Sequence, residues 1–140
     1  MASSIPRATR KRYADSLAGT SMKVALFADI TGYAELTATT YTALDVTATE
    51  VSAVGTGYTT GGYTLTLSSA NLATNGAKVD AVATSVAAAT FTCRYAVVYI
   101  NAAAGTDYIV AVSDFGSNYT VTNGTITITW DATDGLISIQ

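Results

Sequence analysis

The pattern of apolar and polar positions is clearest in the last third of the chain, residues 91–140. Residues 90–100 form a nearly continuous apolar run, which is typical of a central strand covered on both faces. A loop at residues 101–107 follows, and residues 108–112 predict a strand that returns antiparallel to the first. The region therefore begins with a predicted hairpin whose first strand is buried.

Turn residues divide the rest of this region. Residues 114–117 (Asp-Phe-Gly-Ser) predict a turn, and Asn123-Gly124 predicts a tight hairpin between two runs in which threonine alternates with apolar residues. Asp134-Gly135 predicts a further turn before a last strand at residues 136–139. The predicted core comprises seven apolar side chains: Phe91, Val97, Ile109, Ile126, Ile128, Trp130 and Leu136.

The N-terminal part predicts a short helix. Residues 7–18 contain good helix formers, with Ser4 as a candidate N-cap and Gly19 as the C-terminal stop. Arg10 and Lys11 would point away from the main face, and a helix this short is marginal unless it docks. Three residues spaced four apart would share that face: Thr9, Tyr13 and Leu17.

Extended segments and loops alternate through the middle of the chain. Residues 22–27 alternate with a period of two and predict a strand. Residues 29–44 are less regular and predict a surface loop with a short turn of helix, whose role the sequence leaves open. Further extended segments are predicted at residues 46–54, 63–67 and 78–83.

Strands at roughly ten-residue spacing, separated by turn signals, predict an all-β fold. We expect an antiparallel β-sandwich with a short N-terminal helix, and a barrel-like arrangement is the alternative. At 140 residues the chain has the length of one ordinary domain. We expect residues 1–20 to form a basic N-terminal arm that contains the helix, and residues 21–140 to form a single β-sandwich domain.

Charge changes the picture at the surface. Only 12% of residues are charged, about half the usual fraction, which predicts a hydroxyl-rich surface that is easily buried against neighbours. Strand propensity explains the many threonines equally well. Four of the seven basic residues lie within six positions, and from Tyr13 onward three basic residues stand against ten acidic ones, a net charge of −7. The acidic body disfavours nucleic acid as a partner.

Residues that carry catalytic chemistry are scarce. The chain has no histidine, which removes the commonest general base and metal ligand. Cys93 lies alone in an apolar run, so neither a disulfide nor a thiol nucleophile is expected. Asp131 and Asp134 could hold Ca²⁺, although a three-residue spacing in a turn is a weak signal without further oxygens. We expect no enzymatic activity, no cofactor and no metal.

The basic N-terminal cluster is the remaining candidate site. It could contact an acidic patch on a partner, contact nucleic acid, or form a solvated helix face. With a single interleaved aromatic residue, partner docking or a solvated face is favoured over nucleic acid. We see no signal peptide and no membrane-spanning run, and expect no membrane partner. The candidate docking residues are Arg7, Arg10, Lys11, Arg12 and Tyr13.

Four segments in this order resemble a family of small structural proteins of tailed-bacteriophage virions. They are a helix leading into KVALF (residues 23–27), ATEVSAVGTGYTTGGYTLT (48–66), FTCRYAVVYI (91–100) and DYIVAVSDFGSNYTVTNGTITITWDATDGLISIQ (107–140). No single motif is specific, and the ordered combination carries the resemblance. Residues 29–44 and 71–84 match least.

The resemblance implies a non-enzymatic virion structural protein with no catalytic residues to transfer. Within that family the expected role is a capsid cement or decoration protein, made in the host cytoplasm and located on the capsid exterior. The expected partners are the major capsid protein and further copies of the chain in a homo-oligomer. The alternative is a tail-fibre or tail-tip module that binds a receptor or a carbohydrate.

Overall fold

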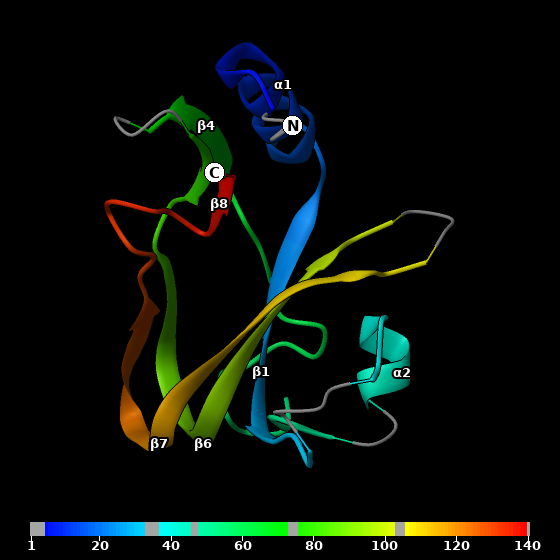
Figure 1. Cartoon of the computed structure of the whole chain (residues 1–140). Coiled ribbons are helices and arrows are strands. Elements are labelled where there is room, and N and C mark those ends of the chain that lie inside the picture. Colours follow the sequence, from blue (N-terminus) through cyan, green and yellow to red (C-terminus); the bar gives the residue numbers. More distant parts are fainter. Residues whose placement is uncertain (1–4, 33–36, 46–47, 73–75, 103–105, 140) are drawn as a thin grey trace. The chain divides into compact units, whose positions relative to one another are not determined.

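The structure is a computed structural model that describes residues 5–32, 37–45, 48–72, 76–102 and 106–139. These residues form two antiparallel sheets and two helices (Figure 1). They group into two compact units, which we describe separately. The larger unit comprises Ser21–Thr64 and Thr84–Thr127, and the smaller unit comprises Met1–Thr20, Leu65–Ala83 and Ile128–Gln140.

The sheet of the larger unit is built around one antiparallel pair, β1 and β6. The pairing runs without a break from Met22 opposite Ile100 to Phe27 opposite Tyr95. The strand order is β2-β1-β6-β7, and β3 also pairs with β1. The bounds of these strands are β1 Met22–Asp29, β2 Thr49–Glu50, β3 Tyr63–Thr64, β6 Thr84–Ile100 and β7 Ile109–Ile128.

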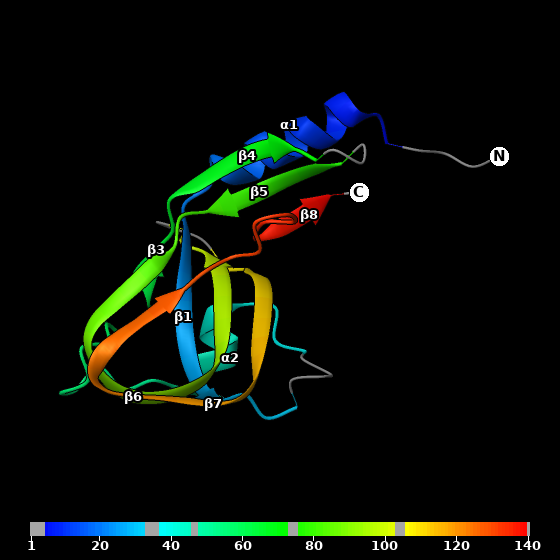
Figure 2. The same ribbon diagram turned by 90° about the vertical axis from the view of Figure 1, so that its left-hand side faces the viewer.

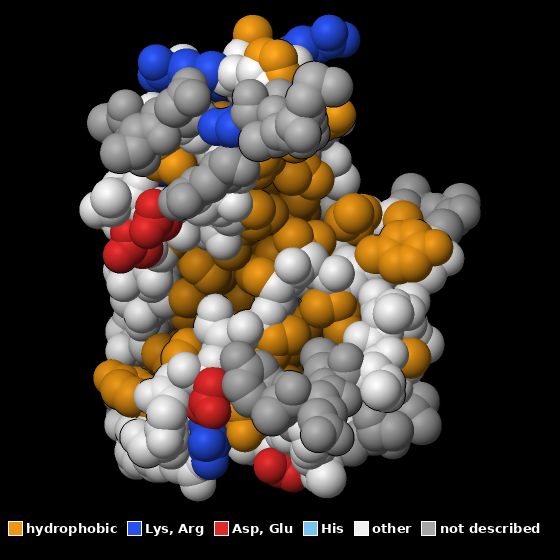
Figure 3. Space-filling view, in the orientation of Figure 1, with side chains coloured by type: hydrophobic (Ala, Val, Ile, Leu, Met, Phe, Trp, Pro, Cys, Tyr) orange, Lys and Arg blue, Asp and Glu red, His pale blue; other side chains and the backbone are white. Residues whose placement is uncertain are grey.

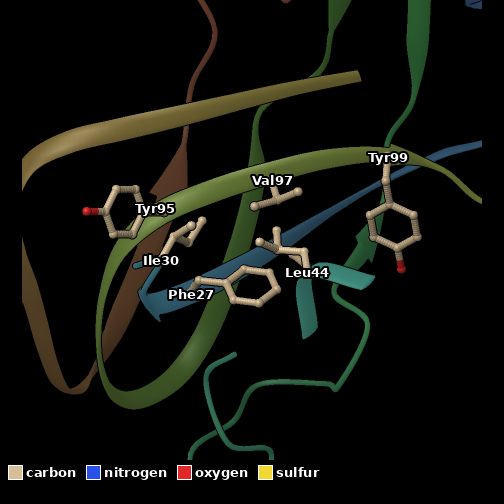
Figure 4. Packing of buried hydrophobic residues seen from close by; sticks show 7 residues of the cluster. Phe27, Ile30, Leu44, Tyr95, Val97 and Tyr99 are labelled. Atoms are coloured by element: carbon tan, nitrogen blue, oxygen red, sulfur yellow. The ribbon is translucent and has the colours of Figure 1, made fainter. Parts of the chain in front are cut away.

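The core of the larger unit lies on one face of this pair. Phe27 and Val97 point toward Leu44 of helix α2 (Tyr41–Asp45), and Tyr95 lies opposite Phe27 in the register (Figure 4). The other face is apolar too, because alternate residues of both strands are also buried. Burial on both faces confirms the prediction for Tyr95–Tyr99. In the preceding part of the run, residues 90–94, only Phe91 and Cys93 are buried.

Strand β7 corrects two predicted turns. Both Asp114–Ser117 and Asn123–Gly124 lie inside this 20-residue strand, which continues beside β6 as the two curve together (Figures 1 and 2). The turn residues produce irregularities instead of reversals. Gly116 has φ +80° and Asn123 has φ +46°. The 17-residue partner strand β6 pairs with β7 on both sides of Gly116, so local turn propensity is overridden.

The register of the long hairpin shifts near Gly116. Arg94 of β6 bonds to Asp114 of β7, whereas Thr92, two residues back along β6, bonds to Thr120. Strand β7 therefore accommodates extra residues at this point, as in a β-bulge.

The smaller unit consists of helix α1 and a three-stranded antiparallel sheet of order β4-β5-β8. The helix lies along β4 and β5 (Figure 2). Its core is formed by Ala14 of the helix with Ala77 and Val79 of β5. The bounds are α1 Arg7–Ala18, β4 Leu67–Asn71, β5 Ala77–Ala81 and β8 Ile137–Ile139.

The predicted fold class is confirmed: the chain is mostly strand, with a short N-terminal helix and two antiparallel sheets. Within the described residues the strands do not close into a barrel. The division into an arm at residues 1–20 and a domain at residues 21–140 stays a prediction. The predicted short helical turn near residues 29–44 corresponds to α2.

Two details of the sequence prediction are wrong in part. The strand expected at residues 63–67 is divided between β3 and β4, and of residues 46–54 only Thr49–Glu50 forms a strand in the described part. Four predicted core residues are buried: Phe91, Val97, Ile126 and Ile128. Three are only half-buried, namely Ile109 near the start of β7, and Trp130 and Leu136 outside the strands.

Gly62 occupies a position that leaves no room for a side chain. It has φ +72°, and a Cβ built on it would lie 1.9 Å from the carbonyl oxygen of Val24. Gly55 has a similar φ of +69° but no atom near its hypothetical Cβ. The two glycines therefore separate the effect of close packing from the effect of backbone conformation.

We predict that Gly62→Ala lowers the free energy of unfolding by about 3 kcal/mol or more, because strand β1 must move. Gly55→Ala should cost only about 1–2 kcal/mol, the strain of a left-handed alanine. Urea denaturation of both variants measures the difference. Equal losses at the two positions would contradict the packing argument.

Candidate docking surface

Helix α1 docks through small apolar side chains. Ala14 is fully buried, and Leu17 and Ala18 pack against the same cluster. A 12-residue helix is marginal in isolation, so this contact holds it. The expected face of Thr9, Tyr13 and Leu17 is wrong for Tyr13, whose side chain is 54% exposed.

The helix ends as predicted and starts differently. At its C-terminal end the Gly19 N–H donates to the carbonyl of Asp15. The residue preceding the helix is Pro6, and no side chain caps the first turn. The predicted cap, Ser4, lies outside the described residues.

Two of the basic residues are held within the smaller unit. Arg7 Nη2 donates to the carbonyl of Leu72 at 3.3 Å, and Lys11 Nζ donates to Ser69 Oγ at 3.1 Å. Lys11 also pairs with Asp15. Hydrogen bonds from Lys11 and Ser69 hold the pKa of Asp15 below its ordinary value, and the bond from Lys11 contributes more. These cations fasten the helix to β4 and the loop that follows it.

Arg10 lies on the docked side as well, contrary to expectation. Its side chain is half-buried and its Nε atom is inaccessible. Helical geometry explains this, because Arg10 and Lys11 stand one turn before the buried Ala14. The prediction that Arg10 and Lys11 point elsewhere is therefore wrong.

Arg12 and Tyr13 are the members of the cluster that face outward. Both side chains are exposed. An open hollow beside the helix is lined by Arg7, Ala8, Lys11 and Asn71. Lys and Arg side chains gather over α1 in the space-filling view (Figure 3). Of the five predicted docking residues, Arg10 and Lys11 are thus half-buried, and Arg7 is exposed but bonded to the carbonyl of Leu72. Arg12 and Tyr13 form the exposed pair.

Asp131 forms a turn of its own. Its Oδ1 accepts the N–H groups of Thr133 at 2.7 Å and Asp134 at 2.8 Å. These two bonds lower the pKa of Asp131, and the bond from the Asp134 N–H contributes most. No group of three or more carboxylates, cysteines or histidines able to hold a metal occurs in the described residues. The arrangement is ordinary turn chemistry.

Asp114 pairs with Arg94 across the hairpin. Arg94 Nε and Nη2 each donate to one carboxylate oxygen of Asp114 at 2.9 Å. The guanidinium also lies 5.2 Å from the ring centroid of Tyr95. This two-pronged bond is the main reason that the pKa of Asp114 is lowered. The carboxylate fixes the strand pair beside Gly116.

Cys93 is buried in β6. Desolvation raises the pKa of its thiol to about 11, so it is protonated at neutral pH. Its burial is what a lone cysteine in an apolar run commonly shows, since a free cysteine packs as a small hydrophobic residue.

A polar network around Glu50 was not predicted from the sequence. Its carboxylate accepts hydrogen bonds from the hydroxyls of Tyr41 and Tyr58 at 2.7 Å each, and from the Gly61 N–H at 2.8 Å. Tyr58 also accepts the N–H of Leu26 at 2.9 Å. One carboxylate thereby ties α2, the glycine-rich loop and strand β1 together.

Tyrosine rings extend this network. Tyr99 stacks on Tyr41 with ring centroids 4.3 Å apart, and its hydroxyl donates to the carbonyl of Gly61 at 2.6 Å. Burial raises the pKa of Tyr58 well above its ordinary value and that of Tyr99 to about 12. The arrangement fixes the glycine-rich loop against α2 and strand β1. In the sequence, the nine tyrosines are the signal that points towards such a network of tyrosine hydroxyls.

Comparisons with known proteins add no relative. No family model matches the chain, and neither a curated protein nor a solved structure matches it. Among the described residues no helix has the length and apolar character needed to cross a membrane.

We predict that stability falls above pH 10, where tyrosine ionises in the unfolded chain. The folded state raises the pKa of both Tyr58 and Tyr99, so their contribution to stability is complete below pH 10 and declines above it. The contribution of Tyr99 is lost as pH rises through about 12, and that of Tyr58 continues to decline beyond it. Urea denaturation between about pH 8 and 11.5 measures the slope.

Tyr58→Phe should make this decline shallower. It should also lower stability at neutral pH by about 1–3 kcal/mol, because the buried N–H of Leu26 loses its acceptor. Tyr13→Phe, at an exposed position on helix α1, is the matched control and should leave the pH profile unchanged. An identical profile in Tyr58→Phe would exclude the network as its source.

Proposed function

We propose that this chain is a non-enzymatic structural protein of a tailed-bacteriophage virion, and that it acts as a capsid cement or decoration protein on the outer shell. The ordered resemblance of four segments to such proteins supports the virion assignment. The charge-poor surface supports it as well, since hydroxyl-rich surfaces lose little hydration when they are buried against a shell.

The proposed contact with the capsid rests on one observation, the exposed pair Arg12 and Tyr13 on the docked helix α1. Arginine and tyrosine are the residue types that most often anchor protein interfaces. Because α1 is fixed by its core contacts, these side chains are presented with little loss of backbone entropy on binding. An acidic groove on the major capsid protein is the complementary surface.

Stabilisation of the shell would follow from mass action. A protein that binds the assembled shell but not its dissociated subunits shifts the equilibrium towards the shell by its binding free energy. No reacting group is required for that role.

The contacts of helix α1 with the smaller unit determine which variant can test the proposal. Deleting residues 1–12 would remove the contacts of Arg7 and Lys11 with the smaller unit, so lost binding could reflect lost structure. Substitutions confined to the exposed pair avoid this difficulty.

We predict that Arg12→Ala combined with Tyr13→Ala weakens binding to capsids that lack the protein by about tenfold or more, since each anchor contributes about 1 kcal/mol or more. Ser16→Ala, exposed on the same helix, is the control and should bind normally. Co-sedimentation with capsids measures the affinities, and circular dichroism checks the fold. Unchanged affinity of the double variant would reject α1 as the anchor.

The tail-module alternative is supported by exposed aromatic residues of the larger unit, namely Tyr108, Phe115 and Tyr119. Rings of this kind could stack on a carbohydrate or receptor. Copy number separates the two roles. A copy number comparable with that of the major capsid protein would indicate a capsid decoration protein. The far smaller copy number of a tail component would indicate a tail module.

A further inference from the structure

Strand β7 is the edge of its sheet. It has β6 on one side and ends the strand order, so the described residues contain no strand beyond it. In the described part of the chain, backbone contacts on this edge are found at its start, where Tyr108 bridges Thr40 and the Ile109 N–H bonds to the carbonyl of Thr39. An edge strand presents a row of backbone donors and acceptors to any strand that can approach.

One part of this edge is well suited to pairing. Residues 117–123 extend from Gly116 to the left-handed Asn123, and six of the seven side chains are exposed. No charged residue and no proline occurs between Asp114 and Asp131. Soluble proteins commonly protect long edges with lysine, proline, shortness or a covering element. Apart from the bulge at its beginning, this segment has none of these.

We propose that residues 117–123 pair antiparallel with the same segment of a second copy, about a two-fold axis at Thr120, to join two sheets edge to edge. A closed dimer of this kind uses one surface twice, so the segment must be complementary to itself. The contact would also leave no free edge at this segment.

The sequence of the segment meets that condition. In this register Tyr119 lies opposite the partner's Val121, a favourable aromatic pair with a β-branched residue, and Asn118 lies opposite the partner's Thr122. Every pair is uncharged, so the net charge of −3 on each copy lies outside the contact. A charged peptide would find no partner charge along this edge, which favours a second copy as the occupant.

The chain already contains the hydroxyl contacts that the interface would continue. Thr92 and Thr120 hydroxyls lie 2.8 Å apart across β6 and β7, and those of Ser85 and Thr127 lie 2.9 Å apart. With Thr120 on the axis, its copy would extend the first of these pairs into a row across the dimer. Threonine pairs of this type stabilise adjacent strands.

This proposal does not depend on the virion assignment, because it concerns the isolated protein. Sedimentation equilibrium of the purified full chain should give a dimer mass. Thr120→Lys places two ammonium groups opposite each other at the axis, and should raise the dimer dissociation constant at least tenfold. Thr59→Lys, at an exposed turn position, is the matched control and should remain dimeric.

A crosslink tests the register. Opposed residues in an antiparallel pair have Cα atoms about 4.5–5.5 Å apart, within the range of a disulfide. Thr120→Cys should therefore form a covalent dimer on mild oxidation, whereas Thr59→Cys should not. The native Cys93 is buried and should not react.

Three outcomes would overturn the proposal. The wild-type chain could be monomeric at every concentration, the dimer could survive Thr120→Lys, or Thr120→Cys could fail to crosslink. A monomer whose Thr120→Lys variant loses capsid binding would assign the edge to a strand of the shell protein instead of a second copy.

Discussion

The antiparallel pairing of β1 with β6 is the constraint on which the larger unit depends. Both strands are buried on both faces from Val24 to Phe27 and from Tyr95 to Tyr99. Strands covered in this way cannot slip by one residue without exchanging two buried faces, so their register is fixed. The other strands of the sheet and the Glu50 network attach to this pair, and the length of β6 determines how far β7 can continue.

The smaller unit depends on a helix to complete its hydrophobic core. A three-stranded sheet has too little apolar surface of its own, and helix α1 covers it with alanine and leucine. Small side chains allow close approach, and Arg7 and Lys11 then bond to backbone and hydroxyl groups at the margin. The same helix therefore has a structural side and an exposed side, and the basic cluster is shared between them.

The sequence predicted element types better than it predicted their ends. Residues 90–100 and the alternation of Ile126 and Ile128 with threonine identified real strands, because burial pattern is a local property of each strand. The predicted turns at residues 114–117 and 123–124 were wrong because local turn propensity carries no information about the long partner strand that overrides it. Glu50 could not be recognised, since its three donors come from positions 8 to 11 residues away that only the folded loop assembles. The candidate docking residues stay a prediction, and their division between two helix faces could not be foreseen without the position of Ala14.

The burial of Cys93 in β6 has an experimental consequence. Because the Cys93 side chain is fully buried, a reagent cannot alkylate it until its strand separates from the sheet and exposes it to solvent. When reclosing is faster than chemistry, the labelling rate reports the equilibrium population of that opened form. With a single cysteine in the chain, thiol labelling of the unmodified protein would measure the local opening of its central strand without any introduced probe.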